Sequence, residues 1–225
     1  MRLAVGATLH ARVLLFDMDG TLVNSTAVIA GLWRHWAARH SLDPDAVLLA
    51  SPGRRTIETV RMFVPHGIDA VAEANGLAAA AAETTQGLAA IPGASALLHS
   101  LPRTCWAVVT SADRFLARCW MRQVGLPVPN VLITAEDVPA GKPDPAGYLQ
   151  ALSRLGCDPA NAIVFEDAPS GLAAGRAAGA RVIAVASTLT PAELGGHEWL
   201  PDFSEVTCMA SRDGSVALRV GEVTP

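Results

Sequence analysis

The sequence lacks the features of several classes of protein. No apolar run among its 225 residues approaches the length of a membrane span. A net charge of −4 and a pI near 5.8 give no electrostatic footprint for nucleic acid or anionic lipid. We therefore expect neither a nucleic-acid partner nor a membrane partner.

Paired cysteines and a clear leader are missing as well. Cys105, Cys119, Cys157 and Cys208 show no C-x-x-C spacing and no nearby histidine, so we expect reduced, packed thiols. The apolar stretch within residues 1–9 is short, and cleavage of a secretory leader near Ala11 would cut into the first predicted strand. These observations favour a cytoplasmic protein.

The chain is rich in apolar residues, with 51% hydrophobic against 17% charged, so it can bury a sizeable core. Strand-like runs alternate with helical patterns, which predicts an α/β fold with a Rossmann-like, doubly wound parallel sheet. The predicted strands are 12–16, 105–110, 131–134, 162–165 and 181–185, and the helices between the later strands are 113–124, 146–155 and 171–178.

Roughly ninety residues separate the first two predicted strands, far more than an ordinary crossover needs. The gap holds only helical patterns, at 27–39, 56–63, 71–74 and 77–88. We therefore expect an inserted α-helical cap domain over residues 24–90 and a core domain formed by residues 1–23 and 91–225. Apolar runs on both sides of Asp213-Gly214 predict a closing hairpin near the C-terminus.

The segment Phe16-Asp17-Met18-Asp19-Gly20-Thr21 places two carboxylates where the first buried strand ends. Ligands of open α/β sheets bind outside the carboxyl ends of the strands. Two like charges this close require a cation or a shared proton. The pair indicates a site for a hard metal ion, or a nucleophile beside a general acid/base, with an ordinary acidic loop as the alternative.

Further polar clusters lie at or beside the ends of later strands. They are Thr110-Ser111, Lys142 in the loop sequence GKPDP, and Glu166-Asp167. Taken singly, they are typical of a helix cap, a surface lysine and a helix start. Because this fold can bring all four clusters to one crevice, their joint placement favours a shared site.

Phosphoryl transfer would use every one of these groups. A carboxylate can attack an anionic phosphate only if their repulsion is cancelled, which Mg²⁺ held by hard oxygens and a lysine ammonium would do. A hydroxyl and backbone N–H groups at a helix start would hold the other phosphate oxygens. The second carboxyl would protonate the departing alkoxide and later take a proton from water.

The ordered motifs DMDGT, Thr110-Ser111, GKPDP and EDAPSG resemble the four motifs of the haloacid dehalogenase superfamily of phosphatases. The resemblance runs from Arg12 to about Val185, and the position of the helical insertion is similar to that of the helical-cap subclass. The stretches GRRTIE, from Gly53, and IPGA, from Ile91, are most similar to bacterial sugar-phosphate and polyol-phosphate phosphatases. This resemblance implies a haloacid-dehalogenase-like core.

The resemblance also implies roles for the acidic residues. Asp17 would be the nucleophile and Asp19 the general acid/base. Asp17, the backbone carbonyl of Asp19 and the Asp167 carboxylate would bind Mg²⁺. Glu166 would either bind the ion directly or support its ligands.

The remaining motif residues would hold phosphate and shape the loop. By the same resemblance, Thr110 and the backbone N–H of Ser111 would bind phosphate oxygens. Lys142 would neutralise charge on Asp17 and on the phosphate. Gly20 would allow a tight turn and Thr21 would stabilise it, with a plain capping role for Thr21 as the alternative.

A loop of the expected cap, with Gly53, Arg54 and Arg55, is predicted to close over the site and contact the leaving group. Pro-Gly favours a fixed turn, and arginine offers planar forks for phosphate or hydroxyl groups. Solvated surface charges are the alternative for both arginines. The leaving group stays open among hexose, polyol, deoxysugar and glycerol phosphates.

The function implied is Mg²⁺-dependent hydrolysis of a small sugar or polyol phosphate through an aspartyl-phosphate. A dehalogenase would not need Asp19. A sugar phosphomutase is an alternative, although its relatives usually carry a histidine where this chain has Ala27-Val28-Ile29-Ala30. A phospho-accepting receiver domain is another, but its acceptor would lie on a later strand, without a helical insertion. We expect a monomer, with a dimer as the alternative.

Overall fold

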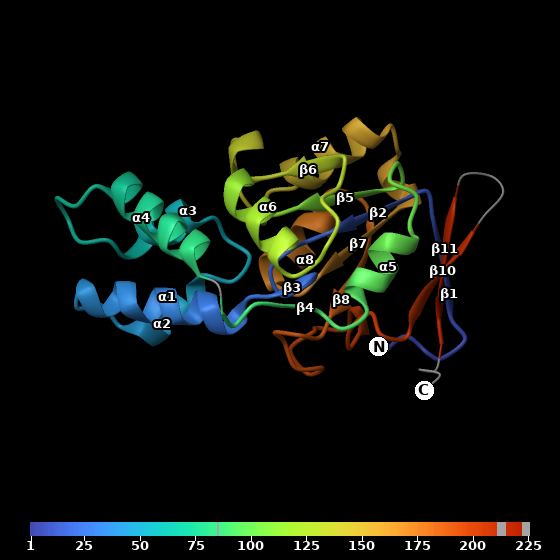
Figure 1. The fold of residues 1–225 in the computed structure, drawn as a ribbon, viewed down its shortest axis with the longest axis horizontal. Coiled ribbons are helices and arrows are strands. Elements are labelled where there is room, and N and C mark those ends of the chain that lie inside the picture. The colour runs from blue at the N-terminus through green and yellow to red at the C-terminus, as the bar shows by residue number, and fades with distance from the viewer. Residues whose placement is uncertain (85, 211–214, 222–225) are drawn as a thin grey trace.

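A computed structural model describes residues 1–84, 86–210 and 215–221 (Figure 1). Its centre is a six-stranded parallel sheet with the order β6-β5-β2-β7-β8-β9. The strands are β2 (Val13–Phe16), β5 (Trp106–Val109), β6 (Val131–Ile133), β7 (Ala162–Glu166), β8 (Arg181–Val185) and β9 (Glu198–Leu200). The order runs outward from β2 in both directions, which confirms the predicted doubly wound fold.

The sheet is covered by helices on both faces, so its central strands β2, β5 and β7 are apolar except for Glu166 at the end of β7. Successive side chains of β2 alternate between two hydrophobic clusters, with Leu14 and Phe16 in one and Val13 and Leu15 in the other. The first cluster includes side chains of α5 (Ala94–Ser100) and α6 (Arg114–Gln123). The second includes those of α7 (Ala146–Leu155) and α8 (Pro169–Ala177). Two 3-10 turns, η1 (Ala135–Asp137) and η2 (Pro159–Asn161), lie in the loops before β7.

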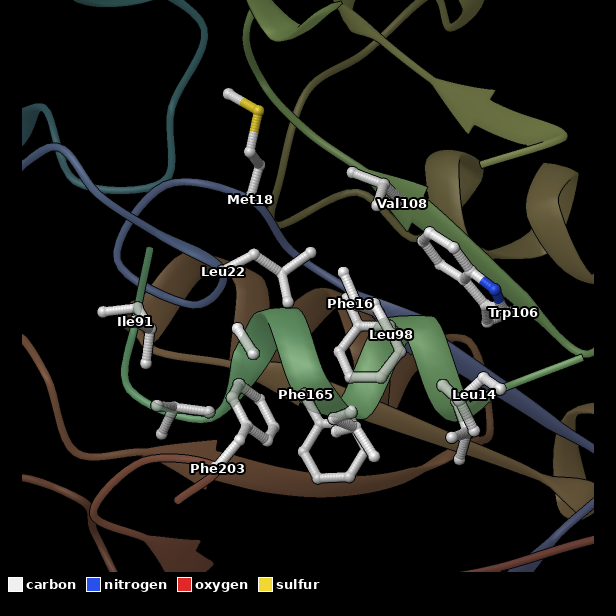
Figure 2. Packing of buried hydrophobic residues seen from close by; sticks show 14 of the residues in the cluster. Leu14, Phe16, Met18, Leu22, Ile91, Leu98, Trp106, Val108, Phe165 and Phe203 are labelled. Carbon is white, nitrogen blue, oxygen red and sulfur yellow. The ribbon is translucent and has the colours of Figure 1, made fainter. Parts of the chain in front are cut away.

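Aromatic packing in the first cluster anchors the end of β2 (Figure 2). The ring of Phe16 stacks on that of Phe165, with centroids 5.1 Å apart, and meets Phe203 edge-on at 5.9 Å. Met18 and Leu22, beyond the strand, are fully buried in the same cluster. Apolar side chains therefore hold the loop that carries Asp17 and Asp19, and they leave the carboxylates on its other side.

A helical insertion, which we define as the segment between β3 (Val23–Asn24) and β4 (Ala89–Ala90), lies apart from the sheet in Figure 1. Its helices are α1 (Thr26–Arg39), α2 (Pro44–Ala50), α3 (Thr56–Phe63) and α4 (Ala70–Glu83). It has its own hydrophobic cluster, which includes Trp33, Trp36, Val47 and Val60. The two strands that lead into and out of the insertion pair with each other in antiparallel fashion.

The sequence patterns missed two short helices, α2 and α5, because seven residues span too few turns to show a period. They also divided α4 into two pieces and extended the second to residue 88, whereas α4 is continuous and ends at Glu83. The apparent break lies at Asn75-Gly76. A glycine costs a helix only about 1 kcal/mol relative to alanine. Packing of α4 against α1, α3 and α6 outweighs that cost.

A three-stranded antiparallel sheet, β1-β11-β10, lies beyond the other end of the core. It consists of β1 (Thr8–Ala11), β10 (Val206–Ala210) and β11 (Val216–Val220). Pairing of β10 with β11 confirms the predicted C-terminal pair of strands, and Asp213-Gly214 lie outside the described residues. No helix within the described ranges is long and apolar enough to cross a membrane.

Candidate active site

Parallel pairing of β2 with β7 brings the acidic motifs together. Asp17 directly follows β2, and its backbone N–H donates to Phe165 O at 3.0 Å. Glu166 ends β7 and Asp167 follows it. Ligand atoms of these three carboxylates all lie within 4.8 Å of one another. Lys142 Nζ donates to both Asp17 and Glu166, so the structure brings four predicted site residues into direct proximity.

Glu166 is fully buried and both of its oxygens are occupied by donors. Its Oε1 accepts hydrogen bonds from Lys142 Nζ and from Tyr148 OH at 3.0 Å. Its Oε2 accepts from the backbone N–H groups of Asp167 at 3.0 Å and Ala168 at 3.2 Å. A carboxylate offers about four lone-pair sites, so these four donors use the acceptor capacity of Glu166. Glu166 therefore orients Lys142 and the start of α8. Asp17 and Asp167 keep acceptor capacity for a ligand.

Asp19 lies in a tight loop whose shape depends on Gly20. Leu22 N donates to Met18 O at 2.9 Å, and Gly20 adopts a φ of +83°, a conformation that favours glycine. A Cβ atom at Gly20 would lie 2.0 Å from Asp167 Oδ2. The Asp19 side chain is oriented by Ser25, whose Oγ donates to Asp19 Oδ1 at 2.7 Å. The loop can therefore present Asp19 beside Asp17 without displacing Asp167.

Burial raises the pKa of the carboxyl groups at this site. Desolvation, followed by the charge of Glu166, raises the pKa of Asp17 well above its usual range and that of Asp167 to about 7. Desolvation also raises the pKa of Asp19 to about 6. For Lys142, desolvation favours the neutral form, but the charges of Asp17 and Glu166 outweigh it and raise the pKa.

This charge balance fits a divalent cation. One lysine faces four carboxyl groups, and the pKa of three of those groups is raised. A hard cation bound by oxygen ligands would offset the excess negative charge. Asp17 and Asp167 have the spacing and free lone pairs that such an ion requires.

Thr110 and Ser111 follow β5, the strand on the other side of β2. The buried Thr110 side chain accepts a hydrogen bond from Ala112 N at 3.0 Å through Oγ1. Ser111 Oγ donates to Gly53 O at 2.7 Å. The structure thus places Thr110 and Ser111 between the end of β5 and the start of α6, and their binding of phosphate stays a prediction.

A cavity of about 420 Å³ opens above these strand ends, between the core and the helical insertion. Asp17, Asp19 and Asp167 line its floor. Its walls are largely apolar and include Ile29, Trp33, Leu48, Leu77, Leu116 and Trp120. The cavity therefore combines an acidic floor with a hydrophobic wall.

The two predicted cap-loop arginines lie in different places. Arg54 is exposed and lines the cavity, as does Gly53. Arg55 is outside the lining of this cavity, and its guanidinium donates to Glu58 and to the carbonyls of Val138 and Pro139. The structure thus places Arg54, but not Arg55, where it can reach a leaving group.

Three polar residues that the sequence patterns missed contact the site residues. Ser25 orients Asp19, Tyr148 donates to Glu166, and Thr188 Oγ1 donates to Asp167 Oδ2 at 2.7 Å. A signal existed for Thr188, because it lies shortly after the carboxyl end of β8. Tyr148 carried none, since a tyrosine on an amphipathic helix is ordinarily part of the core.

Comparisons with known proteins identify the family of this chain. The chain belongs to the haloacid dehalogenase-like hydrolase family, whose model matches residues 11–179. Hexitol phosphatase A of Escherichia coli (strain K12) is 43% identical over 175 residues, covering 76% of this chain and 81% of that protein. Glycerol-1-phosphate phosphohydrolase 2 of Saccharomyces cerevisiae is 36% identical, with 80% of this chain and 77% of that protein covered.

A solved structure is similar in fold. The crystal structure of a hydrolase from Pseudomonas syringae matches with a TM-score of 0.76 and 22% identity, covering 85% of this chain and 94% of that one. At this identity the likeness shows the fold alone. Together, the findings confirm the predicted family, the fold class and the enzyme class of phosphoric monoester hydrolase.

Proposed function

We propose that this chain is a Mg²⁺-dependent phosphatase that hydrolyses a small sugar or polyol phosphate through an aspartyl-phosphate. The observation that carries the proposal is the convergence of Asp17, Asp19 and Asp167 at the floor of one cavity, with the buried Lys142 ammonium bonded to Asp17. Relatives named for hexitol and glycerol-1-phosphate support the substrate class. A cytoplasmic location and a monomeric state stay predictions.

In the first step the Asp17 carboxylate attacks phosphorus, and the bond from phosphorus to the alcohol oxygen breaks. Asp19 gives its proton to the departing alkoxide. With a pKa of about 6, Asp19 can both donate and accept a proton near neutral pH. It then takes a proton from the water that attacks the phospho-Asp17, which releases phosphate and restores the Asp17 carboxylate.

Lys142, Thr110 and Ser111 would bind the transferring phosphoryl group. The Lys142 ammonium already faces Asp17, so it can neutralise the nucleophile and the phosphate at one position. Asp17, Asp167 and the backbone carbonyl of Asp19 would hold Mg²⁺, which supplies positive charge against the phosphate oxygens. Glu166 would support this arrangement through Lys142 and the backbone of residues 167–168.

We further propose that residues 24–90 act as a cap domain on a core formed by residues 1–23 and 91–225. The separate hydrophobic cluster of the insertion and its attachment through the β3–β4 pair support this division. The insertion forms much of the cavity wall, so it would select the leaving group. Arg54 is the residue that we assign to contact with the alcohol.

A substrate panel tests the proposal. Purified protein is incubated with Mg²⁺ and p-nitrophenyl phosphate, glycerol phosphate, hexitol phosphates and hexose phosphates, and released phosphate is measured. We expect turnover that stops with excess EDTA and returns on addition of Mg²⁺. Turnover that persists in EDTA would contradict the metal assignment. Interconversion of hexose phosphates without phosphate release would instead favour a mutase.

A further inference from the structure

One short segment of the helical insertion, residues 52–58, contacts two loops and the first turn of α8, each of which lies next to candidate catalytic groups in the sequence. The contacts are Ser111 Oγ to Gly53 O at 2.7 Å, Ser170 Oγ to Pro52 O at 3.1 Å and Gly141 N to Glu58 Oε1 at 3.1 Å. Ser111 follows the phosphate-binding candidate Thr110, and Gly141 immediately precedes Lys142. Residues 52–58, part of which lines the cavity, are therefore hydrogen-bonded directly to core segments beside the candidate catalytic residues.

The side chains of Arg55 and Glu58 add further contacts between this segment and the core. Arg55 Nε donates to Glu58 Oε1 at 2.7 Å. The same guanidinium crosses to the core, where Nη1 donates to Val138 O and Nη2 to Pro139 O, both at 3.2 Å. Both accepting carbonyls belong to the loop that leads to Lys142, so the planar fork of arginine holds this loop at two points.

Gly141 makes the close approach possible. A Cβ atom at this position would lie 2.7 Å from Glu58 Oε2 and 2.9 Å from Arg55 Nε. With no side chain there, the Gly141 N–H reaches Glu58, and Lys142 then extends its ammonium group to Asp17. A continuous path of contacts thus runs from the helical insertion through Glu58, Gly141 and Lys142 to the nucleophile.

We propose that Arg55 and Glu58 are positioning residues, which act as a latch between the helical insertion and the loop that carries Lys142. The inference rests on the proposed function, in which Lys142 neutralises the phosphate. Neighbouring Arg54 lines the cavity. The segment that places Lys142 therefore also borders the space for the leaving group.

The surroundings of the pair distinguish it from an ordinary surface ion pair. The side chains of Arg55 and Glu58 are 16% and 25% exposed, against 43% and 35% for Arg181 and Glu198, an Arg–Glu pair between neighbouring strands β8 and β9. Exposed pairs of the latter kind have little effect on stability. Arg181 and Glu198 therefore provide a matched control.

The test compares E58A and R55A with E198A and R181A, using p-nitrophenyl phosphate and Mg²⁺. Misplacement of a catalytic group by about 1 Å can cost on the order of 10²-fold in rate. We expect kcat to fall by roughly 10- to 100-fold in the latch variants, with KM within about threefold, and neither constant to change in the control variants. E58Q keeps an acceptor for Gly141 N–H, so it should recover part of the kcat lost in E58A.

Hydrogen exchange gives a readout that does not depend on turnover. We expect the backbone amides of residues 138–142 to exchange faster in E58A than in the wild type, and to be unchanged in E198A. An unchanged kcat or unchanged exchange in E58A would overturn the latch. A wild-type protein that releases no phosphate would overturn the proposed function instead, and the exchange result would still decide whether Glu58 holds the Lys142 loop.

Discussion

The floor and the wall of the cavity are built in opposite ways. The floor consists of the carboxylates of Asp17, Asp19 and Asp167, which accept hydrogen bonds from the side chains of Lys142, Ser25 and Thr188 respectively. The wall consists of apolar side chains from the helical insertion and α6, held by packing. A hydrogen bond holds the distance between its two groups to within a few tenths of an ångström. An apolar surface, in contrast, tolerates replacement of one side chain by another of similar volume. Under the proposed function, the floor would therefore determine the reaction and the wall would determine which alcohol fits.

The largest effect should follow from removing the nucleophile at the floor. D17N keeps the size of the side chain but removes the charge that faces Lys142 and that we propose attacks phosphorus. We expect kcat for p-nitrophenyl phosphate to fall by at least about 10³-fold, since removal of a nucleophile can cost on the order of 10⁶-fold. A D17N protein that retains turnover would show that another group attacks the phosphate.

The second-largest effect should be a loss of stability when Glu166, the buried carboxylate that orients Lys142, is changed. E166Q places an amide N–H₂ against donors, so either Lys142 and Tyr148 or two backbone N–H groups lose their acceptor. We expect the free energy of unfolding, measured by urea denaturation, to fall by about 3 kcal/mol. E198Q, at a partly exposed pair, should lose at most about 1 kcal/mol. Equal losses in the two variants would contradict the assigned role of Glu166.

A smaller effect should follow from changing the wall, where two neighbouring leucines on α2 form a matched pair. Leu48 lines the cavity, whereas Leu49 is 86% exposed. L48Q puts an amide against an apolar surface, so we expect kcat/KM for p-nitrophenyl phosphate to fall about tenfold, with a smaller loss for a hydroxyl-rich hexitol phosphate. L49Q should match the wild type for both substrates. If L48Q lowers both values equally, the wall does not select the leaving group.

The smallest effect should follow from replacing Arg54, the exposed arginine that lines the cavity. Arg54 is exposed, so its contact with an alcohol is screened by water. We expect R54A to raise KM for sugar phosphates about threefold and to leave kcat within about twofold. A loss of kcat as large as that of the latch variants would place Arg54 in the positioning of the phosphate site.

The floor could be predicted from the sequence because its residues obey a simple rule of parallel sheets. Asp17, Thr110 and Asp167 each follow a buried apolar strand, and the pairing of β2 with β5 and β7 brings those strand ends together. Lys142 does not directly follow a strand; the sequence placed it in a loop beside the strand ends, and its role came from the resemblance of its motif. The fold class followed from the same alternation of strands and helices.

The function of the cap-loop arginines could not be predicted in this way. The sequence offers Arg54 and Arg55 as equivalent neighbours, and only the three-dimensional position of the 138–141 loop separates them. A local signal did exist in Glu58, three residues after Arg55, which is a spacing that favours an ion pair on a helix. Such a pair is usually a surface feature, and its connection to Gly141 depends on tertiary packing.

The short β3–β4 pair has a consequence for how this chemistry can be combined with new specificities. Val23 pairs with Ala90 and Asn24 with Ala89, so the chain leaves and re-enters the core at adjacent points. In terms of chain connectivity, the helical insertion between β3 and β4 is a single long hairpin loop of the core. Loop-closure entropy grows only slowly with loop length, so exchanging this segment for another costs the sheet little. Under the proposed function, a replacement segment joined at this pair would also have to supply the contacts that Arg55 and Glu58 make with the Lys142 loop.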